Sequence, residues 1–286
     1  MLTRIFSAPA GRAAVPLGHN EPSMRLGAKR LKAIARDAGL APASAVVLSL
    51  DAPVSATVLD PDRPFYPASM IKVPLVAATL AALAGGLPTA LVTRVAVTEA
   101  NMTANDTASP LQPGYRATLR ELMQLSIAHS DNVATNVLFD VVGRGRATEL
   151  ARDLLALPAT EFHRKLSGSD ALIADPQWDG EHRNSHPAGD AARLFAAIAD
   201  GAVAHAALLR EMLAAQHWND KLSEGLRPGD RFLHKTGDTQ EVTHDGGILV
   251  TQEGRRYVVV AYVGLPSTPE HNARFAPFMR AVRELL

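Results

Sequence analysis

Strand-like patterns lie at both ends of this chain and helical patterns fill its middle, which restricts the possible folds more than any other feature. Five segments are rich in aliphatic and β-branched residues and read as strands: 43–51, 55–59, 231–237, 246–252 and 255–264. Amphipathic helical patterns at 25–39 and 270–286 flank these segments. The simplest assembly is an antiparallel sheet built from both ends of the chain and flanked by the terminal helices.

The middle of the chain is helical in pattern. The apolar spacing predicts helices over 71–84, 117–130, 133–142 and 189–213. Thr118 and Glu121 form a capping-box pattern at the start of the second of these. The sequence therefore predicts an α/β (α+β) protein of two domains. Residues 1–60 and 214–286 would form the sheet domain, and residues 61–213 an all-helical domain.

Composition excludes several classes of function. Lys and Arg together number 29, as do Asp and Glu, so no net charge favours nucleic acid or an acidic membrane. The chain has no cysteine, which excludes thiol catalysis and thiolate metal sites. The most apolar segment, 73–83, is too short to cross a bilayer. Residues 1–18 are interrupted by Pro9, Gly11 and Arg12, so we expect no signal peptide there.

Three short motifs carry the chemistry of this sequence. In chain order they are Ser69-Met70-Ile71-Lys72, Ser130-Asp131-Asn132 and Lys235-Thr236-Gly237. A Ser-x-x-Lys arises by chance about once in 250 residues at average amino-acid frequencies, so alone it means little. All three in this order, each on the type of element its chemistry needs, indicate a serine enzyme of acyl transfer.

The first motif places a nucleophile and its base on one helical face. Residues three apart on a helix are neighbours, so the Lys72 amine can lie beside the Ser69 hydroxyl. Lys72 begins an apolar helix, where burial would lower its pKa and make it a usable base. The structural alternative is a capping serine followed by a lysine that reaches to solvent.

The other two motifs supply groups that handle the substrate. Ser130 can pass a proton from Lys72 to a leaving nitrogen, and Asn132 can hold a substrate amide or carbonyl. Lys235 and Thr236 can bind a substrate carboxylate, and Gly237 lets a substrate lie close to the strand. The oxyanion hole would consist of the N–H groups of Ser69 and Asp238.

These motifs, with Asn136 after the second one, resemble those of the class A β-lactamases and penicillin-binding proteins. The resemblance covers residues 25–286. It implies an αβα sandwich beside an all-helical domain, with the active site in the cleft between them. It also implies Ser69 as the acylated nucleophile, Lys72 as its activator and Ser130 as the proton shuttle. Members of the family are typically periplasmic or secreted.

One departure concerns the water that hydrolyses the acyl-enzyme. The family's lactamases carry a Glu-x-x-x-Asn motif in a loop after the second motif, and the stretch 163–184 lacks it. Counting from Ser-Asp-Asn puts Leu166 at the glutamate position, whereas counting back from Pro187 suggests Asp170. Other carboxylates of this region are Glu161, Asp175 and Glu181. Deacylation is therefore expected to be weak.

The leading hypothesis is a β-lactamase-like serine hydrolase that acts on a small-molecule or peptidoglycan-like amide. It would be a monomer and would need no cofactor and no metal. The alternatives are a D-alanyl peptidase or esterase-like penicillin-binding protein, and a sensor that stays acylated. A metal-dependent hydrolase is a weaker alternative, since it rests only on the spacing of His182, His186, Asp179 and Asp190.

Overall fold

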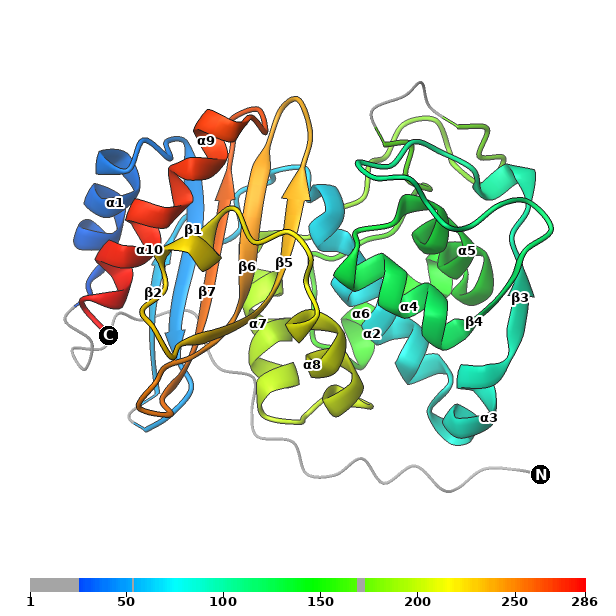
Figure 1. The fold of residues 1–286 in the computed structure, drawn as a ribbon, viewed down its shortest axis with the longest axis horizontal. Coiled ribbons are helices and arrows are strands. Elements are labelled where there is room, and N and C mark those ends of the chain that lie inside the picture. Colours follow the sequence, from blue (N-terminus) through cyan, green and yellow to red (C-terminus); the bar gives the residue numbers. More distant parts are fainter. Residues whose placement is uncertain (1–25, 53, 169–172) are drawn as a thin grey trace.

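The computed structural model describes residues 26–52, 54–168 and 173–286. A five-stranded antiparallel sheet has the order β2-β1-β7-β6-β5, so it is built from both ends of the chain as predicted (Figure 1). The strands are β1 (Ala43–Ser49), β2 (Ser55–Leu59), β5 (Arg231–Asp238), β6 (Thr243–Val250) and β7 (Arg256–Val263). The predicted α/β class with an antiparallel sheet is confirmed.

The strand sequences are almost continuously apolar because both faces of the sheet are covered. Successive side chains of a strand point to opposite faces. On β1, Val46 and Leu48 enter one hydrophobic cluster, whereas Ala45 and Val47 enter another. The sheet therefore lies between two cores, which explains why these segments lack an apolar–polar alternation.

The terminal helices cover one face of the sheet. In Figure 1, α1 (Ala28–Asp37) and α10 (Phe275–Arg283) lie side by side on its left. Leu31 of α1 and Phe278 of α10 share the hydrophobic cluster on this face. The predicted helix over 270–286 is in fact two helices, because α9 (Pro269–Ala273) ends at Arg274.

The opposite face of the sheet is covered by helices from the middle of the chain. α7 (Ala188–Ala199) contacts β1, β6 and β7, and α8 (Ala206–Ala214) contacts β5. The prediction of one helical pattern over 189–213 is wrong between these helices. The chain leaves the helical conformation at Gly201, whose φ of 74° is left-handed and is the kind of conformation that glycine adopts without strain.

The remaining helices pack to the right of the sheet in Figure 1. They are α2 (Lys72–Ala82), α3 (Leu87–Val92), α4 (Leu119–Ala128), α5 (Asn132–Val142) and α6 (Arg144–Asp153), with a small sheet of β3 (Arg94–Ala96) and β4 (Arg116–Thr118). Short 3₁₀ helices are η1 (Ala68–Ile71), η2 (Ala84–Gly86), η3 (Glu99–Asn101) and η4 (Leu222–Gly225). The capping box of Thr118 and Glu121 is confirmed at the start of α4.

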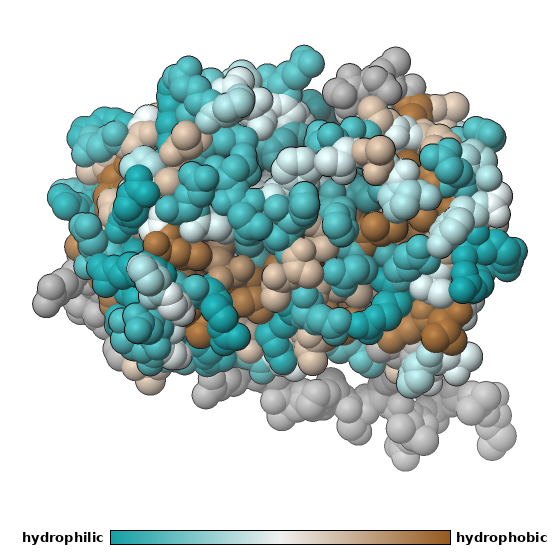
Figure 2. Space-filling model, in the orientation of Figure 1, coloured by the Kyte–Doolittle hydropathy of each residue, from teal (hydrophilic) through white to brown (hydrophobic). Residues whose placement is uncertain are grey.

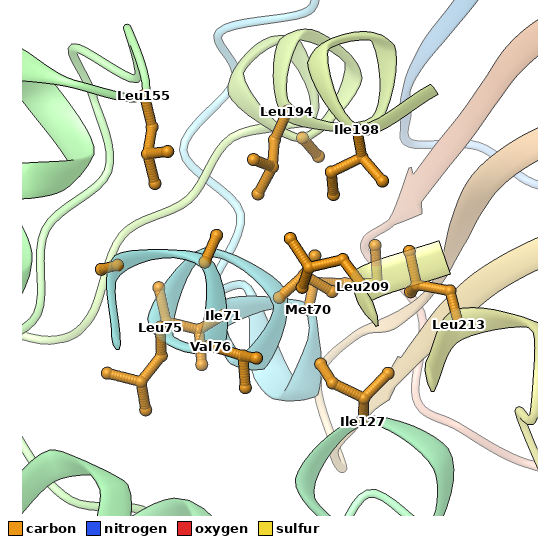
Figure 3. Close-up of a cluster of buried hydrophobic side chains, with 14 of the residues drawn as sticks. Met70, Ile71, Leu75, Val76, Ile127, Leu155, Leu194, Ile198, Leu209 and Leu213 are labelled. Atoms are coloured by element: carbon orange, nitrogen blue, oxygen red, sulfur yellow. The ribbon is translucent and has the colours of Figure 1, made fainter. Parts of the chain in front are cut away.

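Helix α2 lies at the centre of the larger core. Residues 72–80 are all buried, so the helix has apolar neighbours on every side. Figure 3 shows Leu75 and Val76 of α2 among side chains of surrounding elements, such as Ile127 and Leu194. Because nearly all of α2 is shielded from water, its first residue, Lys72, is buried as well.

The domain boundaries at residues 60 and 214 stay a prediction, as does the monomeric state. On the face shown in Figure 2, hydrophobic residues form separate patches within a largely hydrophilic surface. Among the described residues, no helix combines the length and apolarity needed to cross a membrane. The segment 1–18, where we expected no signal peptide, lies outside the described residues.

Candidate active site

Ser69 lies on the short helix η1, directly before α2, and lines a cavity of about 230 Å³. The sequence predicted Ser69 and Lys72 on one helical face, and Ser69 indeed lies where the chain after Pro67 enters a helix. Ala68 has a left-handed φ of 49°, a conformation that non-glycine residues rarely adopt. Such strain often accompanies functional sites, and here it precedes the residue that presents its hydroxyl to the cavity.

Lys72 is completely buried and is held by the second motif. Its Nζ donates to the backbone carbonyl of Ser130, to Ser130 Oγ at 3.1 Å and to Asn132 Oδ1 at 2.8 Å. Among the described residues it makes no hydrogen bond to Ser69. Burial, with the positive charge of Lys235, lowers the pKa of Lys72 well below its usual value. Loss of a proton would leave Lys72 with two N–H groups for three acceptors and free one position of its nitrogen. The role of Lys72 as the base for Ser69 stays a prediction.

Ser130 joins the two buried lysines. It follows α4 and has a left-handed φ of 57°. Its Oγ accepts from Lys72 Nζ at 3.1 Å and from Lys235 Nζ at 3.0 Å. A hydroxyl that accepts two hydrogen bonds still has its own proton to donate, and Ser130 lines the cavity beside Ser69. This arrangement can carry a proton between Lys72 and a group in the cavity.

Asn132 is the first residue of α5, and the side chain of Asp131 caps this helix through Ala134 N–H at 2.8 Å. Asn132 Oδ1 accepts from Lys72, and its Nδ2 donates to the carbonyl of Ala104 at 2.8 Å. Both ends of the amide therefore have protein partners, which orient Lys72. The role of Asn132 in substrate binding stays a prediction.

Lys235, Thr236 and Gly237 lie on the edge strand β5. Lys235 Nζ donates to Ser130 Oγ and, at 2.8 Å, to the carbonyl of Thr236. Burial lowers the pKa of Lys235 to about 7. Thr236 lines the cavity. A Cβ atom at Gly237 would lie 3.0 Å from the carbonyl oxygen of Pro67, so glycine allows η1 to approach the strand closely.

The buried lysines predict a pH dependence of stability that a variant can isolate. The pKa of Lys235 is about 7 in the native protein, whereas in the unfolded chain it has its usual value of 10.5. Between pH 7 and pH 10.5, Lys235 is therefore protonated in the unfolded chain and largely neutral in the native protein. The free energy of unfolding should therefore rise with pH in this window. Relative to Lys235→Met, the wild type should gain about 1.4 kcal/mol per pH unit from about pH 7 to pH 10. Urea unfolding at several pH values measures this, and parallel curves for the two proteins would contradict it.

Asp238 ends β5 beside the cavity. The N–H of Thr239 donates to Val242 on the β6 side, at 2.9 Å. Because successive N–H groups of a strand point in opposite directions, the N–H of Asp238 points to the open edge of the sheet. This direction suits the predicted oxyanion role with the N–H of Ser69, which stays a prediction.

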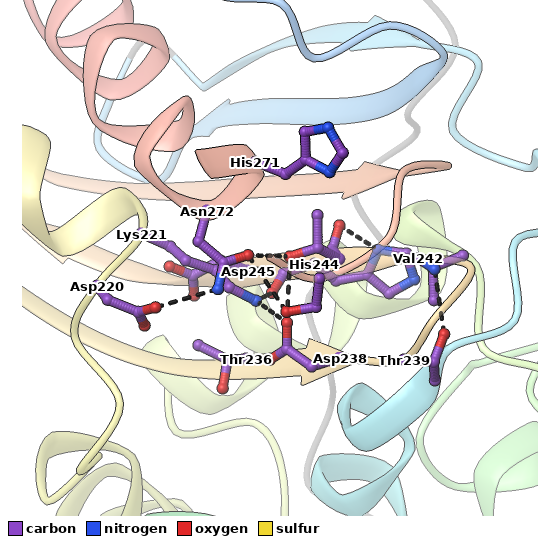
Figure 4. A network of polar contacts seen from close by, with 12 residues as sticks. Asp220, Lys221, Thr236, Asp238, Thr239, Val242, His244, Asp245, His271 and Asn272 are labelled. Carbon is purple, nitrogen blue, oxygen red and sulfur yellow. Dashed lines mark hydrogen bonds and ion pairs between the residues drawn. The ribbon is translucent and has the colours of Figure 1, made fainter. Parts of the chain in front are cut away.

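The Asp238 carboxylate forms an ion pair with the buried Lys221, which is 1% exposed (Figure 4). Lys221 Nζ lies 2.5 Å from Asp238 Oδ1 and 3.0 Å from the carbonyl of His244. Burial alone would raise the pKa of Asp238, but the charge of Lys221 and its hydrogen bond outweigh burial and lower this pKa below its usual value. This carboxylate is therefore ionised, and it is neutralised by a lysine that the sequence analysis did not single out.

Leu166 is fixed beside α5 by a pair of hydrogen bonds. Its N–H donates to Asn136 Oδ1 at 2.8 Å, and Asn136 Nδ2 donates to its carbonyl at 2.9 Å. Asn136 lies one helical turn after Asn132, the partner of Lys72. Leu166 is 6% exposed and its side chain belongs to the larger core. The alternative candidate, Asp170, lies outside the described residues.

The other carboxylates of this loop have partners away from the cavity. Asp175 forms an ion pair with the buried Arg144, and Glu161 Oε2 lies 3.0 Å from His163 Nε2. Glu181 is exposed. None of the three lines the cavity that contains Ser69.

The residues considered for a metal site lie in two different environments. His186 is buried, and its Nδ1 lies 2.8 Å from Thr160 Oγ1. The same hydroxyl lies 2.8 Å from Asp190 Oδ2. His182 pairs with Asp179 on the surface, at 2.6 Å. Over the described ranges, no group of three or more His, Asp or Glu side chains is placed to hold a metal ion.

Sequence analysis missed five residues that line the cavity beside the three motifs: Asp106, Trp218, Asp220, Ser267 and Asn272. All five lie outside the central helices and the sheet, on loops or, for Asn272, on the short helix α9. Loop sequences show no periodicity, so nothing in the local sequence separates these side chains from ordinary surface residues.

Comparison with known proteins places this chain in a family. A model of the beta-lactamase enzyme family matches residues 27–282. The chain belongs to this family. The β-lactamase-family protein is similar to a β-lactamase from Sphaerobacter thermophilus DSM 20745, with 25% identity and a TM-score of 0.78 over 91% of this chain and 97% of that one. No curated protein sequence matches it.

Two further structures extend this comparison. A PBP-A variant with a leucine-to-glutamate substitution, solved as an acyl-enzyme complex with penicillin G, is 25% identical; the TM-score is 0.75 over 89% of this chain and 94% of that one. An ancestral class A β-lactamase is 22% identical, with a TM-score of 0.77 over 91% of this chain and 99% of that one, which shows the shared fold. The predicted resemblance is thus confirmed.

Proposed function

We propose that this β-lactamase-family protein cleaves a β-lactam or a related amide through an acyl-enzyme on Ser69. Ser69 Oγ attacks the carbonyl carbon while its proton passes to neutral Lys72, and the negative oxygen is stabilised by the N–H groups of Ser69 and Asp238. The carbon–nitrogen bond then breaks. The leaving nitrogen takes a proton from Ser130, which regains one from protonated Lys72.

The observation that carries this proposal is the position of Ser130 Oγ. It lies within hydrogen-bond distance of the Nζ atoms of both Lys72 and Lys235, and it lines the same cavity as Ser69. A capping serine with a solvent-reaching lysine, the structural alternative, would not bury Lys72 completely. The pKa values of both lysines are lowered, which favours proton transfer through the Ser130 hydroxyl between them.

We also propose that hydrolysis of the acyl-enzyme is slow. The loop position held by Asn136 carries Leu166, whose side chain can neither accept a proton nor orient a water. A PBP-A variant with glutamate in place of leucine has been solved as an acyl-enzyme with penicillin G. This relative favours a penicillin-binding peptidase or esterase as the second candidate function, with the same Ser69 chemistry.

One experiment tests acylation and deacylation together. The protein is mixed with benzylpenicillin, its intact mass is followed with time, and the modified peptide is mapped. We expect a stoichiometric adduct on Ser69 that persists for minutes to hours, and only slow steady-state hydrolysis of a chromogenic cephalosporin. Absence of an adduct, or an adduct on another residue, would overturn the acyl-enzyme proposal. Complete loss within seconds would overturn slow deacylation.

A further inference from the structure

The charge on the walls of the Ser69 cavity is uneven. Three aspartates line the cavity, namely Asp106, Asp220 and Asp238, and none of the lining residues is a lysine or an arginine. Lys221 neutralises Asp238, as described above. Over the described residues, no cation lies within ion-pair distance of Asp106 or Asp220. Asp106 interacts electrostatically with the buried Lys72 and Lys235, so of these two carboxylates it is Asp220 that faces the cavity without a countercharge among the described residues.

Asp220 is the better placed of these two carboxylates to contact a ligand. Its Oδ2 accepts from Asn272 Nδ2 at 3.1 Å, and the same amide's Oδ1 accepts from Thr243 Oγ1 at 2.9 Å (Figure 4). Thr243 Oγ1 lies 3.1 Å from Asp238 Oδ1. This chain of hydrogen bonds orients Asp220 relative to strand β5, while Asp220 itself stays exposed.

Trp218 provides an aromatic wall beside Asp220. It lines the cavity and is half-buried, and its indole packs edge-on against His217 at a ring-centroid distance of 5.6 Å. Its Nε1 donates to the carbonyl of His129 at 3.4 Å. A half-buried indole beside an exposed carboxylate is a combination that attracts a cationic nitrogen, through the ring face and through the carboxylate oxygens.

Thr236 independently offers a hydrogen-bonding group to a ligand in this cavity. It is 2% exposed and lines the cavity, yet its hydroxyl has no hydrogen-bond partner within the part of the chain that the structure describes. Figure 4 shows Thr236 on β5 in the same view as Asp220 and Asp238. A hydroxyl that opens to the cavity without a protein partner can bind a polar group of a substrate.

We infer that this cavity selects substrates that carry a positively charged nitrogen near the scissile amide, with Asp220 as the recognising carboxylate and Trp218 as the adjoining wall. This inference rests on the proposed acyl-transfer function. Lys235 lies behind the cavity wall and already donates to Ser130 and to the Thr236 carbonyl. An anionic group placed next to Asp220 would therefore meet a carboxylate without a countercharge, whereas a cationic group there would be attracted.

Matched β-lactams test the selectivity. Benzylpenicillin and aminobenzylpenicillin differ only by an ammonium group on the acyl side chain. Two cephalosporins that share an acyl side chain can differ by a pyridinium or an acetoxy group at the other end of the molecule. We expect the cationic member of at least one pair to acylate Ser69 faster. In Asp220→Asn, the ratio of the acylation rates of the cationic and the matched β-lactam should fall about fivefold, which is the effect of losing one partly exposed ionic contact. High salt should lower the same ratio in the wild type.

Asp37→Asn is the matched control, because Asp37 is an exposed aspartate of α1 outside the cavity. It should leave the preference unchanged. The inference is overturned if neither pair shows a preference for the cation, or if Asp220→Asn slows both members of a pair equally. Failure of the underlying function gives a different result, because no β-lactam would then form an adduct in the wild type.

Discussion

Replacing Ser69 by alanine should abolish the penicillin adduct and lower acylation by about 10,000-fold or more, because no other hydroxyl can replace the nucleophile. Ser69 is partly exposed at the cavity, so the loss of one oxygen atom should leave the fold intact. Intact-mass spectrometry after an hour with benzylpenicillin measures the loss, and circular dichroism checks the fold.

Ser223→Ala is a demanding control for this prediction. Ser223 Oγ lies 3.1 Å from His234 Nε2, and His234 Nδ1 lies 2.8 Å from Asp245 Oδ1, which is the order of groups found in serine protease triads. Ser223 does not line the cavity. Labelling should therefore survive in Ser223→Ala. An adduct that persists in Ser69→Ala and disappears in Ser223→Ala would make Ser223 the nucleophile in place of Ser69.

Replacing Leu166 by glutamate should shorten the lifetime of the acyl-enzyme by about 100-fold, since general base catalysis contributes about 100- to 10,000-fold when the base is well placed. Asn136 holds the backbone of Leu166 on both sides, so a new carboxylate starts from a fixed position next to the helix that carries Asn132. We use the lower end of the range because the leucine site is apolar and would need to admit water. The measurement is the decay of the adduct mass after excess penicillin is removed.

Leu166→Gln is the matched variant, because glutamine has nearly the shape of glutamate and cannot act as a base. It should leave the lifetime of the adduct close to that of the wild type. Equal acceleration by both variants would show that water entry, and not a missing base, limits deacylation. An unchanged lifetime in a folded, labelled Leu166→Glu protein would show that this position does not face the ester.

The sequence alone was sufficient for the sheet and for the residues of the three motifs. Buried strands such as 43–49 and 256–263 are long, β-branched runs, and such runs leave few alternatives. β3 and β4 went unnoticed because three residues are too few to show an alternation. The stretch 189–213 is rich in alanine throughout, so its helical pattern hides the break at Gly201.

The walls of the cavity were beyond sequence analysis for a different reason. Trp218 and Asp220 reach it from a loop, and Asp106 from another loop more than 100 residues earlier in the chain. Their meeting depends on tertiary packing, which local periodicity does not encode. Lys221 was missed for the same reason, because a lone lysine in a sequence gives no sign that it is buried beneath Asp238.

The larger hydrophobic cluster crosses the boundary between the sheet and the helices. Val46 and Val260 of the sheet belong to it, as do Leu75 of α2 and Phe139 of α5. Neither part can separate from the other without exposing this shared interior to water. We therefore expect the molecule to unfold in a single cooperative step. We also expect the sheet and the helices to keep their relative positions when a substrate binds in the cleft.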